Sequence, residues 1–510
     1  MNNNLNRIAQ NTGFLFIRML LVLLVGLYTS RLVLKSLGIE DFGIYNVIGS
    51  IIIFFSFFKN ALTNATYRFF AFELGKNNPD NLKKIYSMSI NCHIILASIL
   101  FICIEICGIW FINQRMNINP ERLYAANFVL QFSLLTFVCE IIRTPFNSCI
   151  IAYEKMNYFA IISIVEIIMK LGIAFILINS NTDRLILYSI LMFITSLIML
   201  GIYITYCKNK FKECKYFPYW DKTILKQYSQ YSGYSILVNT ADVCTAQSYS
   251  IFFNLFLGVI YNAALGIANQ VNAQVNSFLS SFTQAFTPQI IKSYASKNFD
   301  YFLKLIVSTS KISYFLFFLV SMPIILNTEF ILKIWLSNYP PITANFIRIV
   351  ICYSLIDSCQ VSLWQAVHAT GNIKTHQILM SVIKFLAIPL IFITLKLGYS
   401  ANIALSIWVF FNLICAIVRT IYMRYLINLQ LSLYIKNTIL PIILITCLSL
   451  PIPFFLCFYI NNEIYQFFIS SIVFELSAIF IIYNYGLNNQ ERNTIKNIIG
   501  KYINKTNQRK

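Results

Sequence analysis

The chain has 510 residues, of which 58% are hydrophobic, 16% aromatic and 11% charged. Soluble domains carry about 25% charged residues, so this composition excludes a water-soluble globular protein, a disordered chain and a collagen-like chain. A membrane-spanning β-barrel does not fit either, because its strands alternate apolar and polar residues, whereas apolar residues here fill whole segments such as 164–178.

Fourteen apolar segments follow one another along the chain, each about long enough to cross a bilayer as a helix of roughly 20–25 residues. The first leads directly into the next, which is typical of a transmembrane helix and not of a cleavable signal peptide. We therefore predict an all-α polytopic membrane protein with two six-helix lobes and two further C-terminal helices. The segments are 14–34, 44–66, 86–112, 122–148, 157–179, 185–207, 229–256, 260–289, 302–326, 343–367, 375–396, 402–424, 438–460 and 464–485.

The basic residues are distributed unevenly between the two sides of the predicted membrane. Most of the 39 Lys and Arg residues lie at the termini and in the even-numbered connections, and only seven lie in the odd-numbered ones. Because cytoplasmic loops carry the excess of Lys and Arg, both termini are predicted to be cytoplasmic. Such loops also face anionic lipid, so the net charge of +20 requires no nucleic-acid partner.

A connection with six lysines, 208–228, separates two halves that resemble each other. The run SLGIEDFGIYN at 36–46 is echoed by FLGVIYNAALGIAN at 256–269, and Lys170 has a counterpart in Lys384. Parallel repeats of this kind are typical of transporters. The predicted parts are an N-terminal lobe 1–210, a basic linker 211–228, a C-terminal lobe 229–430, two helices within 431–486, and a basic tail 487–510 that forms an amphipathic helix on the inner leaflet or a solvated tail.

Neither cysteine nor histidine forms a pattern typical of a metal or redox site. The 13 cysteines include no CxxC pair and lie mostly in apolar runs, as Cys103 and Cys352 do, and the three histidines lack metal-ligand spacing. We predict packing cysteines without disulfides, and no metal or other cofactor.

Charged residues within the predicted spans are candidate functional groups, because charge deep in a bilayer normally faces a cavity or a partner. Glu166 and Lys170, four residues apart, are predicted to neutralise each other. Lys384 has no acid at that spacing, so its charge must be met by another helix, by water or by substrate. The cations are Arg18, Lys59, Lys170, Lys311, Arg348 and Lys384, and the acids are Glu105, Glu140, Glu166, Asp242, Asp357 and Glu475.

The remaining embedded charges differ in how they are interpreted. Lys59 and Lys311 lie near mid-span and are predicted to face a water-filled lumen. Arg18 and Arg348 lie nearer to helix ends, where extension toward the membrane interface is an alternative. No functional role is predicted for Glu105 or Glu475.

The segment 260–289 is unusually rich in amides and hydroxyls. Helix pairs in membranes normally need one or two such residues, so two adjoining polar stripes predict a water-exposed, ligand-facing wall. Together with the cations, this wall suggests an anionic, glycosylated substrate; another polar solute is the alternative. The first stripe is Asn269, Asn272, Asn276, Ser280 and Thr283, and the second is Gln270, Gln274, Ser277, Ser281 and Gln284.

Soluble catalytic motifs such as GxSxG, a P-loop and HExxH are missing from the sequence, and the largest odd-numbered connection, around 327–342, has two charges. A membrane-embedded polysaccharide polymerase or ligase would be expected to carry a larger periplasmic loop. The sequence therefore predicts that the protein is not an enzyme, with such a polymerase or ligase as the alternative.

Two N-terminal runs, LYTSRLVLKSLGIEDFGIYNVIGSII at 27–52 and ATYRFF at 65–70, carry a family resemblance. With the 6+6+2 arrangement, the chain resembles bacterial lipopolysaccharide and polysaccharide (O-antigen-type) flippases of the multidrug/oligosaccharidyl-lipid/polysaccharide exporter superfamily. The resemblance implies a two-lobed transporter of the bacterial inner membrane. It would move polyprenyl-diphosphate-linked oligosaccharide between leaflets by alternating access. It implies diphosphate contact for Arg18, Lys59, Lys311 and Lys384.

The sequence interpretation is thus a lipid-linked oligosaccharide flippase driven by an ion gradient. Its predicted partners are the lipid-linked substrate, membrane lipids, a polysaccharide polymerase and glycosyltransferases. The first alternative is a multidrug or cation antiporter of the same superfamily. The cavity candidates are Arg18, Lys59, Lys311, Arg348, Lys384, Asn269, Asn272 and Asn276, and the candidates for ion coupling are Asp242, Asp357 and Glu140.

Overall fold

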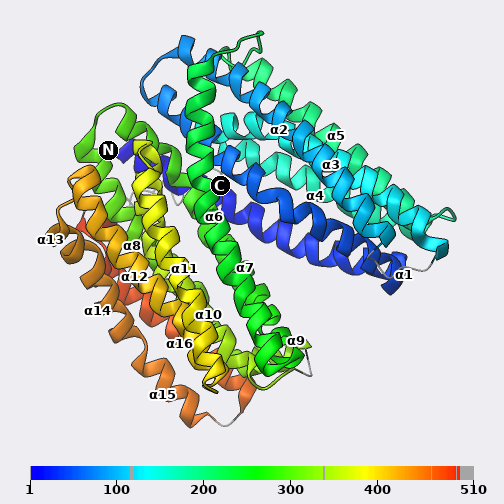
Figure 1. Cartoon of the computed structure of the whole chain (residues 1–510). Helices are drawn as coiled ribbons and strands as arrows, with labels where there is room; N and C mark the ends of the chain where they lie inside the picture. Colours follow the sequence, from blue (N-terminus) through cyan, green and yellow to red (C-terminus); the bar gives the residue numbers. More distant parts are fainter. Residues whose placement is uncertain (1, 115–119, 337–338, 461, 490, 494–510) are drawn as a thin grey trace, which may run out of the picture. The chain divides into compact units, whose positions relative to one another are not determined.

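The computed structural model describes residues 2–114, 120–336, 339–460, 462–489 and 491–493, and every regular element among them is helical (Figure 1). The chain divides into two compact units. We call residues 11–239 the N-terminal unit, and residues 2–10 together with the described residues from 240 onward the C-terminal unit.

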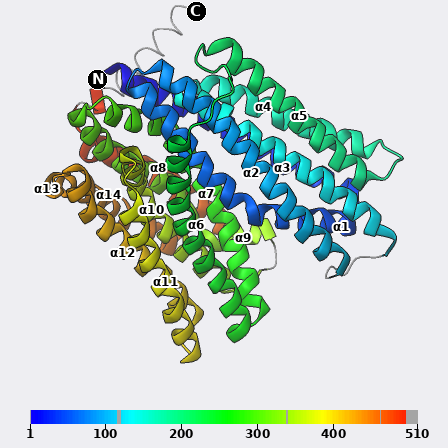
Figure 2. The ribbon, with the colours of Figure 1, turned by 45° about the horizontal axis from the view of Figure 1, so that its top comes forward.

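The N-terminal unit is a bundle in which α3 is the central helix. It packs against α2 and α5, and α4 packs against α5, so that these four helices run side by side (Figures 1 and 2). Small and aliphatic side chains, among them Ala97, Val129 and Leu134, form the core. The elements are α1 (Asn2–Gly75), α2 (Pro79–Gln114), η1 (Pro120–Arg122), α3 (Leu123–Ala152), α4 (Met156–Ile178) and α5 (Arg184–Lys210), followed by α6 (Lys222–Leu257), which continues into the C-terminal unit.

The C-terminal unit is organised around α10, which packs against α7, α8 and α12. Aromatic pairs such as Phe253–Phe346 and Phe318–Phe474 fill its core. The elements are α7 (Val259–Ala295), α8 (Phe299–Leu326), α9 (Thr328–Leu336), α10 (Thr343–Thr370), α11 (Lys374–Lys396), α12 (Ala401–Ile427), α13 (Leu431–Tyr434), the π-helical turn η2 (Ile435–Ile439), α14 (Leu440–Ser449), α15 (Pro451–Tyr459), α16 (Glu463–Ile481) and the π-helical turn η3 (Ile482–Gly486).

The repeated sequence runs adopt the same local backbone. Gly38 interrupts α1 with φ 79° and ψ 174°, and Gly258 separates α6 from α7 with φ 92° and ψ 177°. This region of backbone space is essentially restricted to glycine. The two halves therefore share a helix–glycine–helix break at equivalent points of the run that they have in common.

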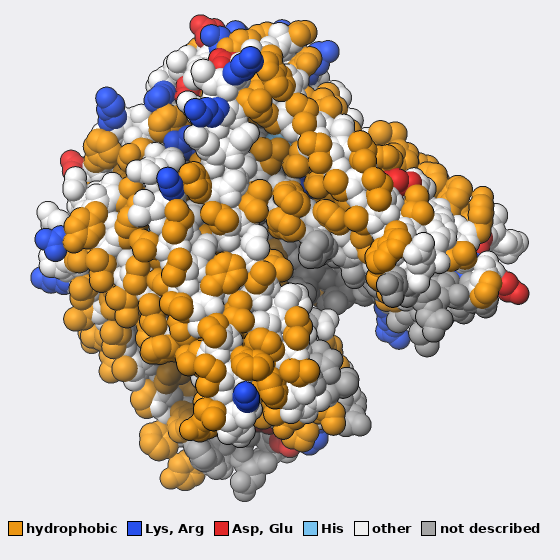
Figure 3. Space-filling model, viewed as in Figure 1, with side chains coloured by type: hydrophobic (Ala, Val, Ile, Leu, Met, Phe, Trp, Pro, Cys, Tyr) orange, Lys and Arg blue, Asp and Glu red, His pale blue; other side chains and the backbone are white. Residues whose placement is uncertain are grey.

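Helices cover all fourteen predicted spans. Among the described residues, eleven helical segments are long and apolar enough to cross a membrane by length and composition. The other three spans lie in the second part of α1, in α6 and in α7, which carry many polar residues. Figure 3 shows hydrophobic side chains over most of the visible helix surfaces, with Lys and Arg mainly toward the helix ends. Apolar helix surfaces suit lipid, in which a helix satisfies its own backbone hydrogen bonds; the chain is a multi-pass, all-α membrane protein.

The basic connection is tied to the helices beside it. The backbone N–H of Phe217 donates to Ser87 on α2, and the hydroxyl of Tyr153 donates to Glu213. Asp221 accepts hydrogen bonds from the backbone and hydroxyl of Thr223, which lower the pKa of that carboxyl. Because Asp221 directly precedes α6, it acts as the N-terminal cap of that helix. Helix α6 thus begins within the segment 211–228 that was predicted as a linker.

Candidate functional site

A group of charged side chains lies within the N-terminal unit, and we call Arg18, Arg143, Glu166 and Lys170 the Glu166 cluster. Lys170 donates to one oxygen of Glu166 at 2.8 Å, and Arg143 of α3 donates to the other at 3.1 Å. The predicted Glu166–Lys170 pair is confirmed, and the structure adds Arg143 to it.

Arg18 of α1 completes the Glu166 cluster. Its guanidinium lies 4.6 Å from the centre of the Phe159 ring, and it is close enough to Glu166 and Tyr203 to interact electrostatically. The buried Nε of Arg18 has no hydrogen-bond partner among the described residues. The cluster therefore contains three cations and one carboxylate, a formal excess of two positive charges.

Lys59 and Glu140 form a second charged pair in the same unit. Lys59 of α1 donates to Glu140 of α3 at 2.9 Å, and both side chains are partly exposed. Lys59 also lies 5.5 Å from the centre of the Phe137 ring. Glu140, a candidate for ion coupling, is therefore matched with one of the cationic cavity candidates.

The C-terminal unit has a charged group of its own, Asp242, Asp357, Lys384 and Arg419, which we call the Asp357 cluster. Lys384 of α11 forms an ion pair with Asp242 of α6, so another helix meets the charge of Lys384. Asp357 of α10 lies within electrostatic reach of Arg419, Lys384 and Asp242. Two acids and two cations make this cluster formally neutral.

Arg419 connects the Asp357 cluster to a buried histidine. Its Nε lies 3.2 Å from Nε2 of His376, and both side chains are buried. An arginine nitrogen can only donate, so His376 accepts this hydrogen bond at Nε2 and is neutral. The interaction fixes the side chain of Arg419 beside Asp357.

The polar face of α7 is divided between packing and exposure. Asn272 accepts a hydrogen bond from Ser354 of α10 at 2.8 Å, and Asn276 donates to the same hydroxyl at 3.2 Å. Two of the three asparagine candidates therefore connect helices. The exposed residues of this face include Asn269, Gln270, Gln274 and Ser280, whereas Ala268, Val275 and Phe282 are buried.

This division predicts a pattern of chemical labelling. In a background without native cysteines, Asn269→Cys and Gln274→Cys should react with a membrane-impermeant thiol reagent. Ala268→Cys and Val275→Cys, on the buried face of the same helix, should stay unlabelled. The measurement is the labelled fraction by mass shift, and equal labelling of the two pairs would contradict a water-exposed polar face.

Lys311 and Arg348 both bind groups of the protein itself, and the expectation for Lys311 is wrong. Lys311 does not face a water-filled lumen: its side chain is 1% exposed and donates to Glu491 at 2.9 Å. Arg348 donates to Glu329 at 2.6 Å and to the carbonyl of Ile325 at 3.2 Å. Lys311 is therefore enclosed by the protein, whereas Arg348 is 34% exposed and keeps further N–H donors.

Sequence reasoning missed Arg143 and Arg419 as embedded cations. Both lie toward the ends of their predicted spans, 122–148 and 402–424, and neither was named among the embedded charges. In the structure α3 continues to Ala152 and α12 to Ile427, which places both residues inside helices. The signal that was available is their spacing from other polar groups on the same helix, such as Glu140 three residues before Arg143.

Comparison with known proteins finds similarity among solved structures. No family model matches the chain, and no curated protein matches it. The structure of an outward-facing multidrug resistance MATE family transporter of the MOP superfamily is similar, with a TM-score of 0.70, 13% identity, and coverage of 85% of this chain and 97% of that one.

Two further similar structures support the same conclusion. One is a MATE mutant with a TM-score of 0.70 and 14% identity, covering 83% of this chain and 96% of that one. The other is a MOP superfamily transporter from Pyrococcus furiosus, described as having a binding pocket of reversed polarity, with a TM-score of 0.69, 14% identity, and coverage of 83% and 97%. At these identities the similarity shows that the chain has the fold of these transporters.

Proposed function

We propose that the protein is a transporter that moves a lipid-linked oligosaccharide with an anionic diphosphate across the bacterial inner membrane by alternating access. The observation that carries this proposal is the charge of the Glu166 cluster, in which Arg18, Arg143 and Lys170 outnumber the single carboxylate. Uncompensated positive charge within membrane helices is costly, so it favours an anionic ligand.

The chemistry of these cations suits a diphosphate. Arginine has five N–H donors in a planar fork that matches phosphate oxygens, and lysine has three donors. Arg143 and Lys170 each bind Glu166 through one nitrogen, so further donors remain for a ligand. The exposed amides of α7, such as Asn269 and Gln274, can both donate to and accept from sugar hydroxyls.

The shared fold supports a transport role over a polymerase or ligase, because the similar structures are described as transporters. Similar structures of MATE proteins are described in straight and bent conformations, which supports movement between states. We infer that both termini are cytoplasmic and that a polysaccharide polymerase and glycosyltransferases are partners.

An ion gradient is proposed to drive the cycle. Asp242, Asp357 and Glu140 each lie beside a cation. Protonation of Asp242 or Glu140 would remove the charge that holds Lys384 or Lys59, and the released lysine would be free to bind an anion. Exchange of a proton or a cation at these carboxylates would thereby couple ion flow to substrate binding.

Multidrug export is the second candidate function, and it is favoured by the multidrug resistance transporter among the similar structures. The formal neutrality of the Asp357 cluster is compatible with a cationic substrate, whereas the positive excess of the Glu166 cluster is not. The two candidates therefore differ in the sign of the substrate charge.

A transport assay distinguishes them. Purified protein in liposomes should speed the loss of a fluorescent, short-chain polyprenyl-diphosphate sugar from the inner leaflet, measured by dithionite quenching. Arg18→Gln should slow this by about tenfold, the value of one charge-assisted hydrogen bond. Arg31→Gln, an exposed arginine on the same helix, should transport normally. Uptake of a lipophilic cation, without movement of the diphosphate lipid, would show a multidrug transporter instead.

A further inference from the structure

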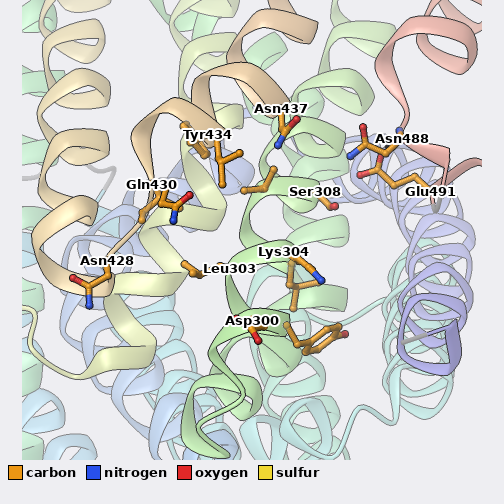
Figure 4. Close-up of a pocket in the computed structure, with 15 residues that line it drawn as sticks. Asp300, Leu303, Lys304, Ser308, Asn428, Gln430, Tyr434, Asn437, Asn488 and Glu491 are labelled. Carbon is orange, nitrogen blue, oxygen red and sulfur yellow. Dashed lines mark hydrogen bonds between the residues drawn. The ribbon is translucent and has the colours of Figure 1, made fainter.

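A cavity of about 460 Å³, lined by both apolar and polar side chains, lies in the C-terminal unit and contains none of the residues of the two charged clusters. It is enclosed where α8 begins, where α12 ends and where η2 follows α13. Figure 4 shows Lys304 on α8, Asn428 after α12, Asn437 on η2, and Asn488 and Glu491 on the segment after η3, all around one space. Nothing in the proposed transport cycle uses this cavity.

Glu491 carries an unmatched acceptor at the wall of the cavity. Its side chain is buried, and its Oε2 accepts from Lys311 at 2.9 Å and from the backbone N–H of Asn488 at 2.7 Å. Its Oε1 is buried and has no hydrogen-bond partner among the described residues. A buried carboxylate oxygen without a donor is costly, so this position favours a ligand that brings an N–H or O–H donor.

The cavity also carries charges of both signs. Asp300 and Lys304 are exposed residues of α8, four positions apart, and both line the cavity. Neither forms an ion pair with another described residue. The charge of Glu491 is already matched by Lys311, so the wall offers one cation and one free carboxylate. A ligand with a phosphate and an ammonium group complements this arrangement.

Apolar surface continues from the cavity along α13 and α14. Leu433 lines the cavity and is 48% exposed, and Leu440, two turns further on, is 56% exposed. Because α8 begins and α12 ends at this level, the cavity lies at the ends of membrane helices, where lipid headgroups are found. The exposed leucines then provide a path for an acyl chain toward the hydrocarbon core.

We propose that this cavity binds the headgroup of a zwitterionic phospholipid with a primary ammonium group, of the phosphatidylethanolamine type. The ammonium donates to Oε1 of Glu491 and faces Asp300, the phosphate binds Lys304 and the amides of Asn437 and Asn488, and an acyl chain lies on Leu433 and Leu440. A choline headgroup has no N–H to donate, and a glycerol headgroup brings no cation for Asp300.

Native mass spectrometry of the delipidated full-length protein tests the proposal with lipids that share acyl chains. Phosphatidylethanolamine should bind about tenfold more tightly than phosphatidylcholine or phosphatidylglycerol, since one lipid alone supplies a charged donor. Lys304→Gln should weaken its binding about fivefold. Lys436→Gln, an exposed lysine of η2 that does not line the cavity, should have no effect.

The lipid-binding proposal can be overturned without any measurement of transport. Equal affinity for the ethanolamine and choline lipids would show that no N–H donor is recognised. Unchanged binding in Lys304→Gln, with an unchanged thermal midpoint, would show that the lipid binds elsewhere. Soluble phosphoethanolamine that binds as tightly as the lipid would show a site for a free headgroup, without the acyl-chain contact.

Discussion

Lys384→Met should lower transport of the diphosphate lipid by at least about tenfold, the value of a lost charge-assisted interaction. Its ammonium is the partner of Asp242 and acts on Asp357. Methionine would leave these two carboxylates with Arg419 as the remaining cation of the cluster. The measurement is the initial rate of lipid movement in liposomes, at equal amounts of reconstituted protein.

Two further variants separate a role in transport from a role in packing. Lys384→Arg keeps the charge but changes its geometry, so it should retain part of the rate. Lys384→Met combined with Asp242→Asn removes both charges of the pair and should restore thermal stability without restoring transport. Wild-type rates in Lys384→Met, or in the double variant, would make the pair a structural element only.

Among the proposed substitutions, Lys311→Met should cause the largest loss in the free energy of unfolding. Lys311 and Glu491 are buried, with side chains 1% and 9% exposed, and the change would leave the carboxylate of Glu491 without its cation. Breaking a buried ion pair by removing one partner costs about 3–5 kcal/mol. The measurement is the midpoint of thermal unfolding in detergent, followed by the intrinsic fluorescence of the protein.

The matched control for this prediction is an exposed pair of the same type. Lys333 and Glu463 lie 2.8 Å apart with side chains 64% and 54% exposed, and such pairs contribute about 0–1 kcal/mol. Lys333→Met should therefore leave the midpoint nearly unchanged. Lys311→Met combined with Glu491→Gln should recover most of the loss, because no buried charge then remains. A double variant as unstable as Lys311→Met would mean that Lys311 acts through packing.

The sequence alone was sufficient for the features that depend on neighbouring residues. Apolar segments predict spans because lipid requires every backbone group to be paired within its own helix, and all fourteen are helical in the structure. The Glu166–Lys170 pair follows from the spacing of one helical turn, and the polar face of α7 follows from the same periodicity. Which of its amides are exposed and which bind Ser354 does not follow from periodicity, because that depends on the position of α10.

The tertiary structure decided the partners of Lys384 and Lys311. Lys384 binds a carboxylate 142 positions earlier in the chain, and Lys311 binds one 180 positions later. Which two charged side chains come close enough to pair depends on how the helices pack. That packing in turn depends on side chains spread over many helices. The same reason explains why the sequence did not assign Arg143 and Arg419 to the clusters. Their membership depends on which carboxylates the neighbouring helices bring close to them. The excess of cations around Glu166, on which the proposed substrate depends, became visible once α1, α3 and α4 were packed together.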